Sequence, residues 1–535
     1  MAAPRIEVHD LAVPMPDGTK LATDLIVAPD GERHPVLLVR TPYARASLRG
    51  GHDPIGLARD GWAVVLQDVR GRVDSDGVFD AMAQERPDGA ATVEWCAAQP
   101  WSNGRVAMLG ASYNGYVQWA AARQRPKGLA AIGPMLTTPY NERTWFKEGG
   151  AFRFGPWATW SMAMATAGNK GTRAQERRAL KAVGRWRELS RYPFDPAPIA
   201  EHFPAFADWY GADESYWRAL DGPGTIASTV RVPGYHLAGW YDIFVEGSIE
   251  AYEELTHRSR SESVRRTQRL VVGPWGHTLL LLQVVGALDF GSEANWLNRG
   301  IPGEQLAFLR EAAEGREPAG GASVFVMGRN SWLDLETWPP PTDEVAFHLE
   351  SRSAANSARG DGRLLADPTD RAGSDHFRHD PTDPVPTVGG RHLLWDLTPA
   401  GPAEQTPVEQ RNDVLVYTSN VLDRELTIAG AVRAELYVAS TAPRTDVTVK
   451  LVDVHPDGKA YNVVDSIKRD DLTPGRTTRV TVPAGRTAQT FLRGHRIRVQ
   501  IASSNAPGYD CLEAADQTVH WGGRTPSRVL LPVLR

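Results

Sequence analysis

A serine that could act as a nucleophile stands in the segment Gly110-Ala111-Ser112-Tyr113-Asn114-Gly115. This segment joins a predicted strand at 106–110 to a predicted helix that begins near Gly115. Small residues permit the sharp turn that lifts a serine above the edge of a sheet, at the positive end of the next helix. The second glycine comes one position later than in the usual Gly-x-Ser-x-Gly motif. A helix N-cap is therefore a second interpretation of Ser112.

A histidine must take the proton of such a serine, and in α/β hydrolases the acid and then the histidine follow the serine along the chain. His277 comes directly after the apolar strand predicted at 270–275, where a loop can reach the serine. An ordinary surface-loop histidine is the alternative. The remaining histidines of this stretch lie in a predicted insertion, within a strand and beyond the far end of a helix: His202, His236 and His257.

An aspartate that could hold this histidine follows another predicted strand. Asp242 comes after 234–240 and before a predicted helix at about 243–255, the edge of a parallel sheet where catalytic groups gather. An aspartate before a helix is also a good N-cap, so spacing alone leaves both roles open. The other aspartates in suitable chain order fall inside the predicted insertion: Asp195, Asp208, Asp213 and Asp221.

The elements that would position these groups form a repeating pattern. Short apolar runs alternate with helical segments, and runs that are apolar throughout are typical of a parallel sheet covered by helices on both faces. The pattern predicts a doubly wound α/β fold of the α/β-hydrolase type. The predicted strands are 36–39, 62–68, 106–110, 129–135, 234–240 and 270–275, and the predicted helices are 90–98, 115–124 and 243–255.

A chain of 535 residues exceeds what one core usually supports, and three domains are predicted. Residues 1–138 and 232–319 form a discontinuous α/β-hydrolase catalytic domain, and the aromatic-rich segment 139–231 forms a helical cap domain. Apolar residues recur every three positions in one part of the cap, which predicts a helix through Leu180, Val183, Trp186 and Leu189.

A C-terminal β-sandwich domain is predicted for residues 320–535. Helical periodicity disappears there, and short strand-like runs are separated by Gly, Pro and Asp. These runs include 324–327, 414–418, 431–438, 445–453, 477–482 and 496–502. The polar tract 351–383 is predicted to be an exposed loop.

Composition excludes several classes of function. The net charge of −5 comes from 59 basic and 64 acidic residues without a long run of one sign, which indicates no nucleic-acid or membrane partner. Two distant cysteines make neither a disulfide framework nor a zinc-ligand set, so a reducing cytoplasm is expected. The beginning of the chain carries no apolar signal region, and the run 279–285 is too short to span a membrane. No metal and no cofactor is predicted.

Taken together, the sequence resembles the CocE/NonD hydrolases, the family of bacterial cocaine esterase, which is related to α-amino acid ester hydrolases and Xaa-Pro dipeptidyl peptidases. The resemblance runs nearly end to end and includes the late-glycine turn around Ser112. It implies a jelly-roll topology for the C-terminal sandwich. The matching segments are Arg40-Thr41-Pro42-Tyr43, 67–72, 110–115, Gly239-Trp240-Tyr241-Asp242, Gly273-Pro274-Trp275-Gly276-His277, 377–390, 413–419 and 494–499.

The resemblance implies a reaction through an acyl-enzyme. Ser112 would attack an ester or amide carbonyl, His277 would act as base and then as acid, and Asp242 would stabilise the imidazolium. The expected partner is a small-molecule ester or amide, and a homodimer is left open.

The resemblance also implies roles for four further residues near the serine. The Tyr43 hydroxyl and the Tyr113 backbone N–H would form the oxyanion hole. Trp160 and Phe244 match aromatic positions of the family's acyl pocket, with ordinary core packing as the alternative.

Three classes of function are considered for these residues. An esterase or amidase and an acyltransferase or macrocyclase would use the same acyl-enzyme, and an intact set of catalytic residues argues against a non-catalytic binding protein. An Xaa-Pro dipeptidyl-peptidase-like or amino acid ester hydrolase activity is also open. Amino acid ester hydrolases hold the substrate ammonium with carboxylates, for which Glu142, Glu148 and Asp208 are the candidates.

Overall fold

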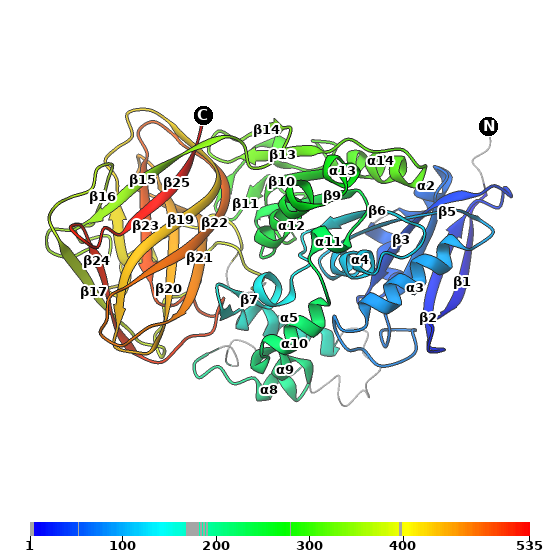
Figure 1. Cartoon of the computed structure of the whole chain (residues 1–535), viewed down its shortest axis with the longest axis horizontal. Helices are drawn as coiled ribbons and strands as arrows, with labels where there is room; N and C mark the ends of the chain where they lie inside the picture. The colour runs from blue at the N-terminus through cyan, green and yellow to red at the C-terminus, as the bar shows by residue number, and fades with distance from the viewer. Residues whose placement is uncertain are drawn as a thin grey trace.

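The computed structural model describes residues 5–51, 53–166, 181, 185, 188, 191–278, 280–394 and 399–535. An α/β domain and a β-sandwich lie side by side, and the short helices of the insertion lie below their junction in the view of Figure 1. Within the described part of the chain, none of the helices combines the length and apolar character needed to span a membrane.

The sheet of the α/β domain has ten strands in the order β1-β2-β4-β3-β5-β6-β9-β10-β13-β14. Its parallel centre contains all six strands predicted for this domain. Every residue of β3 and β9 is buried, which is why their sequences do not alternate between apolar and polar. These six strands are β3 (His34–Thr41), β4 (Ala63–Asp68), β5 (Ser102–Ala111), β6 (Leu129–Met135), β9 (Gly234–Tyr241) and β10 (Gln268–Gly276).

Helices cover both faces of this sheet. Leu37 and Val39 of β3 pack with α14 (Ile301–Ala313), whereas Val36 and Leu38 face the opposite layer. That layer is formed by α3 (Glu85–Ala97), α4 (Tyr113–Arg123) and α12 (Val245–Arg258). The doubly wound α/β fold is therefore confirmed.

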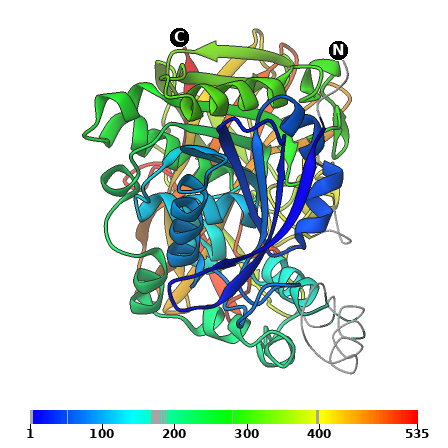
Figure 2. The same cartoon turned by 90° about the vertical axis from the view of Figure 1, so that its right-hand side faces the viewer.

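Two N-terminal strands extend the sheet beyond the prediction. Strand β1 (Glu7–Pro14) pairs antiparallel with β2 (Lys20–Val27), and β2 pairs antiparallel with β4. Both lie nearest the viewer in Figure 2. Residues of β1 are mostly exposed, so it lacks the continuous apolar run by which the central strands were recognised.

The strand predicted at 324–327 is present, but its assignment to the sandwich was wrong because it belongs to this first sheet. Strand β13 (Gly321–Val326) pairs in parallel with β10, and β14 (Ser331–Leu335) completes the edge. Helix α14 connects β10 to β13 as a crossover, and five of the six β13 residues are buried. The strand is therefore another member of the α/β pattern.

The β-sandwich is built from the eleven strands that follow. Along β19, buried residues alternate with more exposed ones, as in a sheet with one face on a core. The strands are β15 (Thr342–Glu350), β16 (Arg363–Leu365), β17 (Gly373–His379), β18 (Leu415–Thr418), β19 (Leu426–Ser440), β20 (Arg444–Val454), β21 (Ala460–Asp471), β22 (Thr478–Phe491), β23 (Arg496–Ala502), β24 (Ala515–Trp521) and β25 (Arg528–Leu534).

The tract 351–383 is not simply a loop, because β16 and β17 lie within it. Strand β17 pairs antiparallel with β24 over seven residues. Its buried Asp375, Phe377 and His379 alternate with more exposed neighbours, but only one of these three is apolar. Polar residues at buried positions concealed this strand in the sequence.

The insertion between β6 and β9 is mainly helical and is held by aromatic packing. Phe146 lies 4.5 Å from Trp209 and 5.1 Å from Trp217 between ring centroids. The predicted helix through Leu180, Val183, Trp186 and Leu189 lies outside the described residues. The described elements are η1 (Asn141–Phe146), β7 (Lys147–Glu148), β8 (Ala151–Phe152), α5 (Phe154–Thr166), α8 (Ala197–Ala200), α9 (Ala205–Gly211), α10 (Glu214–Asp221) and α11 (Ile226–Thr229).

Candidate active site

Ser112 occupies a strained turn between β5 and α4. Its φ of 59° and ψ of −125° are rarely adopted by residues other than glycine. A Cβ on Gly110 would lie 2.6 Å from the Asn114 Cβ, and one on Gly115 would lie 2.5 Å from the Thr137 Cγ2. The late glycine is therefore required by the close approach of Thr137, and the turn has no room for larger neighbours.

The three residues predicted to act together are brought together. The His277 Nε2 lies 3.0 Å from the Ser112 Oγ, and the His277 Nδ1 lies 2.6 Å from the Asp242 Oδ2. The Ser112 side chain makes no capping hydrogen bond to α4, so the N-cap interpretation does not describe its hydroxyl. With a proton on Nδ1, the imidazole can donate to Asp242 and accept the serine proton on Nε2.

Asp242 combines the two roles that its position left open. Its side chain is fully buried at the end of β9. While Oδ2 contacts the histidine, Oδ1 accepts the backbone N–H of Phe244 at 2.7 Å, just before α12 begins. The local hydrogen bond fixes the carboxylate and leaves its second oxygen for His277.

Two of the other histidines have local partners. The His236 Nε2 lies 3.0 Å from the Gln268 Oε1, and burial lowers the pKa of this imidazole to about 4. The His257 Nε2 lies 3.2 Å from the Trp338 carbonyl oxygen. His202 stays in the insertion, as predicted. The structure brings only His277 of these four to Ser112.

Three of the four alternative aspartates also have local hydrogen-bonding roles. Asp195 accepts the N–H of Ala197 at 2.9 Å, and Asp213 caps α10 through the N–H of Tyr216 at 3.0 Å. The Asp221 Oδ1 accepts the Asn141 N–H at 2.9 Å.

Tyr43 lies beside the serine and is prepared to donate a hydrogen bond. Burial raises the pKa of its phenol, although hydrogen bonds with Trp160 and Ser112 act in the opposite direction, so the hydroxyl keeps its proton. The Trp160 Nε1–H donates to the Tyr43 oxygen at 3.1 Å. Since this bond uses a lone pair and not the phenol hydrogen, the hydrogen is left for another acceptor. The Arg72 Nε–H holds the same loop through the Pro42 carbonyl at 2.9 Å.

Tyr113 is the first residue of α4, where backbone N–H groups have no acceptor within the helix. Its buried side chain fixes this end of the helix. The hydroxyl donates to the Glu85 Oε1 at 3.0 Å and accepts the Met82 N–H at 2.8 Å. Its ring stacks on Trp160 with centroids 6.0 Å apart and planes 10° apart. Glu85 carried no signal in the sequence, because its role arises only from a contact between distant segments.

Trp160 and Phe244 both contact candidate site residues while packing in an aromatic core. Trp160 contacts Tyr43 and Tyr113 as described, and the Phe244 ring meets the His277 ring edge to face at 5.4 Å. Phe244 also stacks on Trp145 at 4.3 Å. Both residues are almost fully buried, so each one packs in the core and also lies next to the candidate site.

Two of the carboxylates considered for binding an ammonium group are already paired. The buried Glu148 accepts hydrogen bonds from Arg391 at 2.9 Å and from Arg153 at 2.7 Å. Burial alone would raise the pKa of Glu148, but Arg391 and Arg153 lower it to about 2. Glu142 pairs with Lys147 at 3.1 Å. Glu148 therefore joins the insertion to the C-terminal part of the chain.

Comparison with known proteins identifies the family. Residues 17–279 match the model of the X-Pro dipeptidyl-peptidase (S15 family), and residues 315–529 match the X-Pro dipeptidyl-peptidase C-terminal non-catalytic domain. The sequence is 33% identical to cocaine esterase of Rhodococcus sp. (strain MB1 Bresler) over 98% of each chain. The chain belongs to the CocE/NonD hydrolase family. It is therefore a serine hydrolase of the esterase and peptidase class.

Solved structures share the fold of this CocE/NonD hydrolase along its whole length. An α-amino acid ester hydrolase is 23% identical with a TM-score of 0.78, covering 99% of this chain and 97% of its own. An aminopeptidase from the marine sediment archaeon Thaumarchaeota archaeon is 22% identical with a TM-score of 0.77, covering 100% and 97%. At these identities the likeness concerns the fold alone.

Proposed function

We propose that this CocE/NonD hydrolase cleaves a carboxylic ester through an acyl-enzyme on Ser112. The observation that carries the proposal is the position of His277, which lies 3.0 Å from the serine oxygen and 2.6 Å from Asp242. Such an imidazole can take the serine proton, and the buried aspartate can stabilise the positive charge that results.

The reaction has two halves. The Ser112 oxygen attacks the ester carbonyl as its proton moves to the His277 Nε2, and the tetrahedral intermediate collapses when that proton passes to the leaving alcohol. Water then attacks the acyl carbonyl and gives a proton to the same nitrogen. Collapse returns this proton to Ser112 and releases the carboxylic acid.

The oxyanion of both intermediates would be held by two donors of different kinds. One is the Tyr43 hydroxyl, whose oxygen is held by the Trp160 N–H and whose hydrogen is left to donate. The other is the backbone N–H of Tyr113 at the start of α4. Donors aimed at the developing charge strengthen as the carbonyl oxygen becomes an anion.

The aromatic surroundings favour an apolar acyl group. Phe244 touches the imidazole edge to face, and Trp160 touches the proposed oxyanion donor. We therefore expect flat or branched apolar acyl groups to be accepted better than charged ones, because a buried charge without a partner would lose its hydration.

The test is turnover of a panel of p-nitrophenyl esters that differ only in the acyl group. Ser112→Ala should abolish turnover, and Ser47→Ala, which changes an exposed serine of α1 (Arg45–Gly51), should leave it unchanged. Full turnover by Ser112→Ala would refute the proposal. Adding an alcohol or an amine to the assay also measures acyl transfer, because a transferred acyl group gives a product heavier than the acid.

A second candidate substrate is an ester or amide with a free α-amino group. Partial burial and then the charge of Asp208 raise the pKa of Asp80, and the neighbouring Phe79 ring lies 6.0 Å from the Tyr113 ring. Two like charges that interact in this way, one of them next to Phe79, would favour an ammonium group. An alanine ester should then be preferred over its N-acetylated form, and Asp208→Asn should remove that preference. Equal rates for both esters would exclude this candidate.

A further inference from the structure

Asp453, His455 and His495 form a cluster of possible metal ligands in the β-sandwich. One ligand-capable atom on each residue lies within 4.8 Å of the other two. The His495 Nδ1 lies 2.8 Å from the Asp453 Oδ1, and the His455 Nε2 lies 3.7 Å from the Asp453 Oδ2. These residues are separate from Ser112, Asp242 and His277.

The fold brings the three together through strand pairing. Asp453 lies on β20 and His455 follows two positions later, so their side chains leave the same face of the extended chain. His455 begins a tight turn in which its N–H donates to the Lys459 carbonyl at 2.8 Å. His495 immediately precedes β23, which pairs antiparallel with β20 and sets Asp453 opposite Ile497.

We propose that Asp453, His455 and His495 bind one divalent transition-metal ion of the Zn²⁺ class. Two imidazoles and one carboxylate are a ligand set that zinc and iron(II) sites use, with positions left open for water. Metal–ligand bonds of about 2.0–2.1 Å place neighbouring ligand atoms roughly 2.8–3.4 Å apart in octahedral or tetrahedral geometry. The observed separations of 2.8 and 3.7 Å lie close to this range.

The surroundings provide room and further oxygen donors. A cavity of about 150 Å³ adjoins the cluster, and its lining includes Asp289 and Asn330 besides the three proposed ligands. Asp453 also accepts a hydrogen bond from the Gln489 side chain at 3.3 Å. Hydrogen bonds of this kind orient metal ligands, and the cavity can hold the water molecules that complete the coordination.

The cavity lies where the sandwich meets the α/β domain, so the role that follows for the ion is structural. Tyr241, the residue before Asp242, lines the cavity, and its hydroxyl donates to the Asn462 carbonyl at 3.3 Å. Phe290, which follows the His277 loop, lines it as well. An ion bound here would link the turn after β20 to the start of β23, beside strand β9, which ends directly before the candidate catalytic acid Asp242. The ion would therefore stabilise the folded state, since it binds a site that the unfolded chain lacks.

The experiment uses the full chain treated with EDTA, dialysed and then titrated with ZnCl₂. We expect one zinc ion bound per chain by mass spectrometry of the metal, and a melting temperature that rises with zinc concentration. Removing a hydrogen bond that supports a metal ligand lowers metal affinity by roughly 10- to 100-fold, and removing the ligand itself should lower it by at least as much. His455→Asn and His495→Asn should each weaken zinc binding by this factor or more and reduce the zinc-dependent rise in melting temperature.

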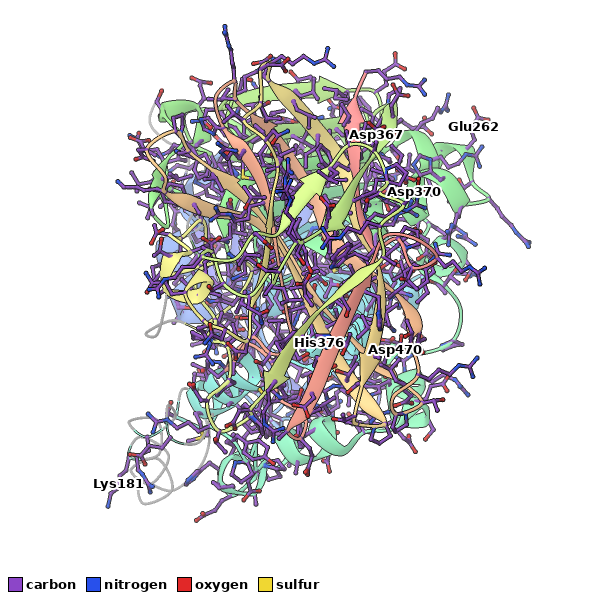
Figure 3. The ribbon with its side chains drawn as sticks, turned by 90° about the vertical axis from the view of Figure 1, so that its left-hand side faces the viewer. Lys181, Glu262, Asp367, Asp370, His376 and Asp470 are labelled. Carbon is purple, nitrogen blue, oxygen red and sulfur yellow. The ribbon has the colours of Figure 1, made fainter. Side chains whose placement is uncertain are left out.

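A matched control is His376→Asn. His376 is exposed on β17, on the side of the sandwich shown in Figure 3. This variant should bind zinc like the parent. Wild-type protein that binds no zinc would overturn the proposal, as would parental zinc affinity in His455→Asn. If His495→Asn does not fold, two measurements still test the proposal. One is the zinc affinity of His455→Asn, which changes a partly exposed residue, and the other is the absorption spectrum of the cobalt(II)-loaded parent, which reports imidazole ligands.

Discussion

Replacing Tyr43 with phenylalanine separates catalysis from packing at the proposed oxyanion hole. The change keeps the ring and removes one oxygen atom. That oxygen accepts the Trp160 N–H at 3.1 Å, and its hydrogen is the proposed oxyanion donor. The variant should therefore lose both stability and rate, each by an amount that can be stated in advance.

The loss of rate distinguishes a catalytic role of Tyr43 from a packing role better than the loss of stability does. Removing one oxyanion donor lowers kcat by about 100- to 1000-fold in enzymes of known mechanism. KM should change little, because the donated bond strengthens only as the carbonyl oxygen becomes negative. Leaving the buried Trp160 N–H without its acceptor should cost about 1–3 kcal/mol of unfolding free energy.

The assay is steady-state hydrolysis of one p-nitrophenyl ester, with urea unfolding measured on the same preparations. Trp160→Phe is the matched control, since it removes the N–H that holds the phenol but keeps the proposed donor. It should lower kcat only several-fold, the effect of about 1 kcal/mol of positioning. If Tyr43→Phe loses stability but keeps the parental kcat, Tyr43 is a packing residue and the proposed oxyanion hole is wrong.

Two further changes test other parts of the site and the fold. Asp242→Asn should lower kcat by about 10⁴-fold without unfolding the chain, because an amide favours the wrong tautomer of His277. Parental turnover in this variant would exclude Asp242 as the acid. Glu148→Gln should cost about 3–5 kcal/mol at neutral pH, because Arg153 loses its carboxylate partner and Arg391 keeps only Glu246. Because the folded-state pKa of Glu148 is lowered from 4.5 to about 2, its stabilisation is complete above the unfolded pKa and is lost as pH falls through that interval. Unfolding curves should therefore converge for parent and variant in acid, and a pH-independent difference would contradict the assigned ion pairs.

The sequence predicted the centre of the fold and the proximity of the three candidate catalytic residues because both depend on local patterns. Continuous apolar runs mark buried parallel strands, and residues directly after such strands meet at one edge of the sheet. Ser112, Asp242 and His277 each occupy such a position, which made them candidates, and the family resemblance then favoured the catalytic interpretation over the local alternatives. The edge strand β1 and the polar strand β17 lack that pattern and were missed.

Contacts between distant segments could not be predicted in the same way. The hydrogen bond between Tyr43 and Trp160 joins residues 117 positions apart, and the one between Tyr113 and Glu85 joins residues 28 apart. Tyr43 was nominated only through resemblance to a family. The cluster of Asp453, His455 and His495 contains no cysteine and depends on the pairing of β20 with β23, so counting cysteines gave no sign of it.

The central claim, an acyl-enzyme on Ser112, is tested most directly by the mass of the intact protein during turnover of a slowly hydrolysed aryl ester. Wild-type protein should gain the mass of one acyl group, and peptide mapping should place it on the peptide that contains Ser112. Ser112→Ala should gain nothing, whereas His277→Ala should acylate far more slowly because no base takes the serine proton. An adduct of the same mass on Ser112→Ala, or turnover by the parent with no adduct on this peptide, would contradict the mechanism.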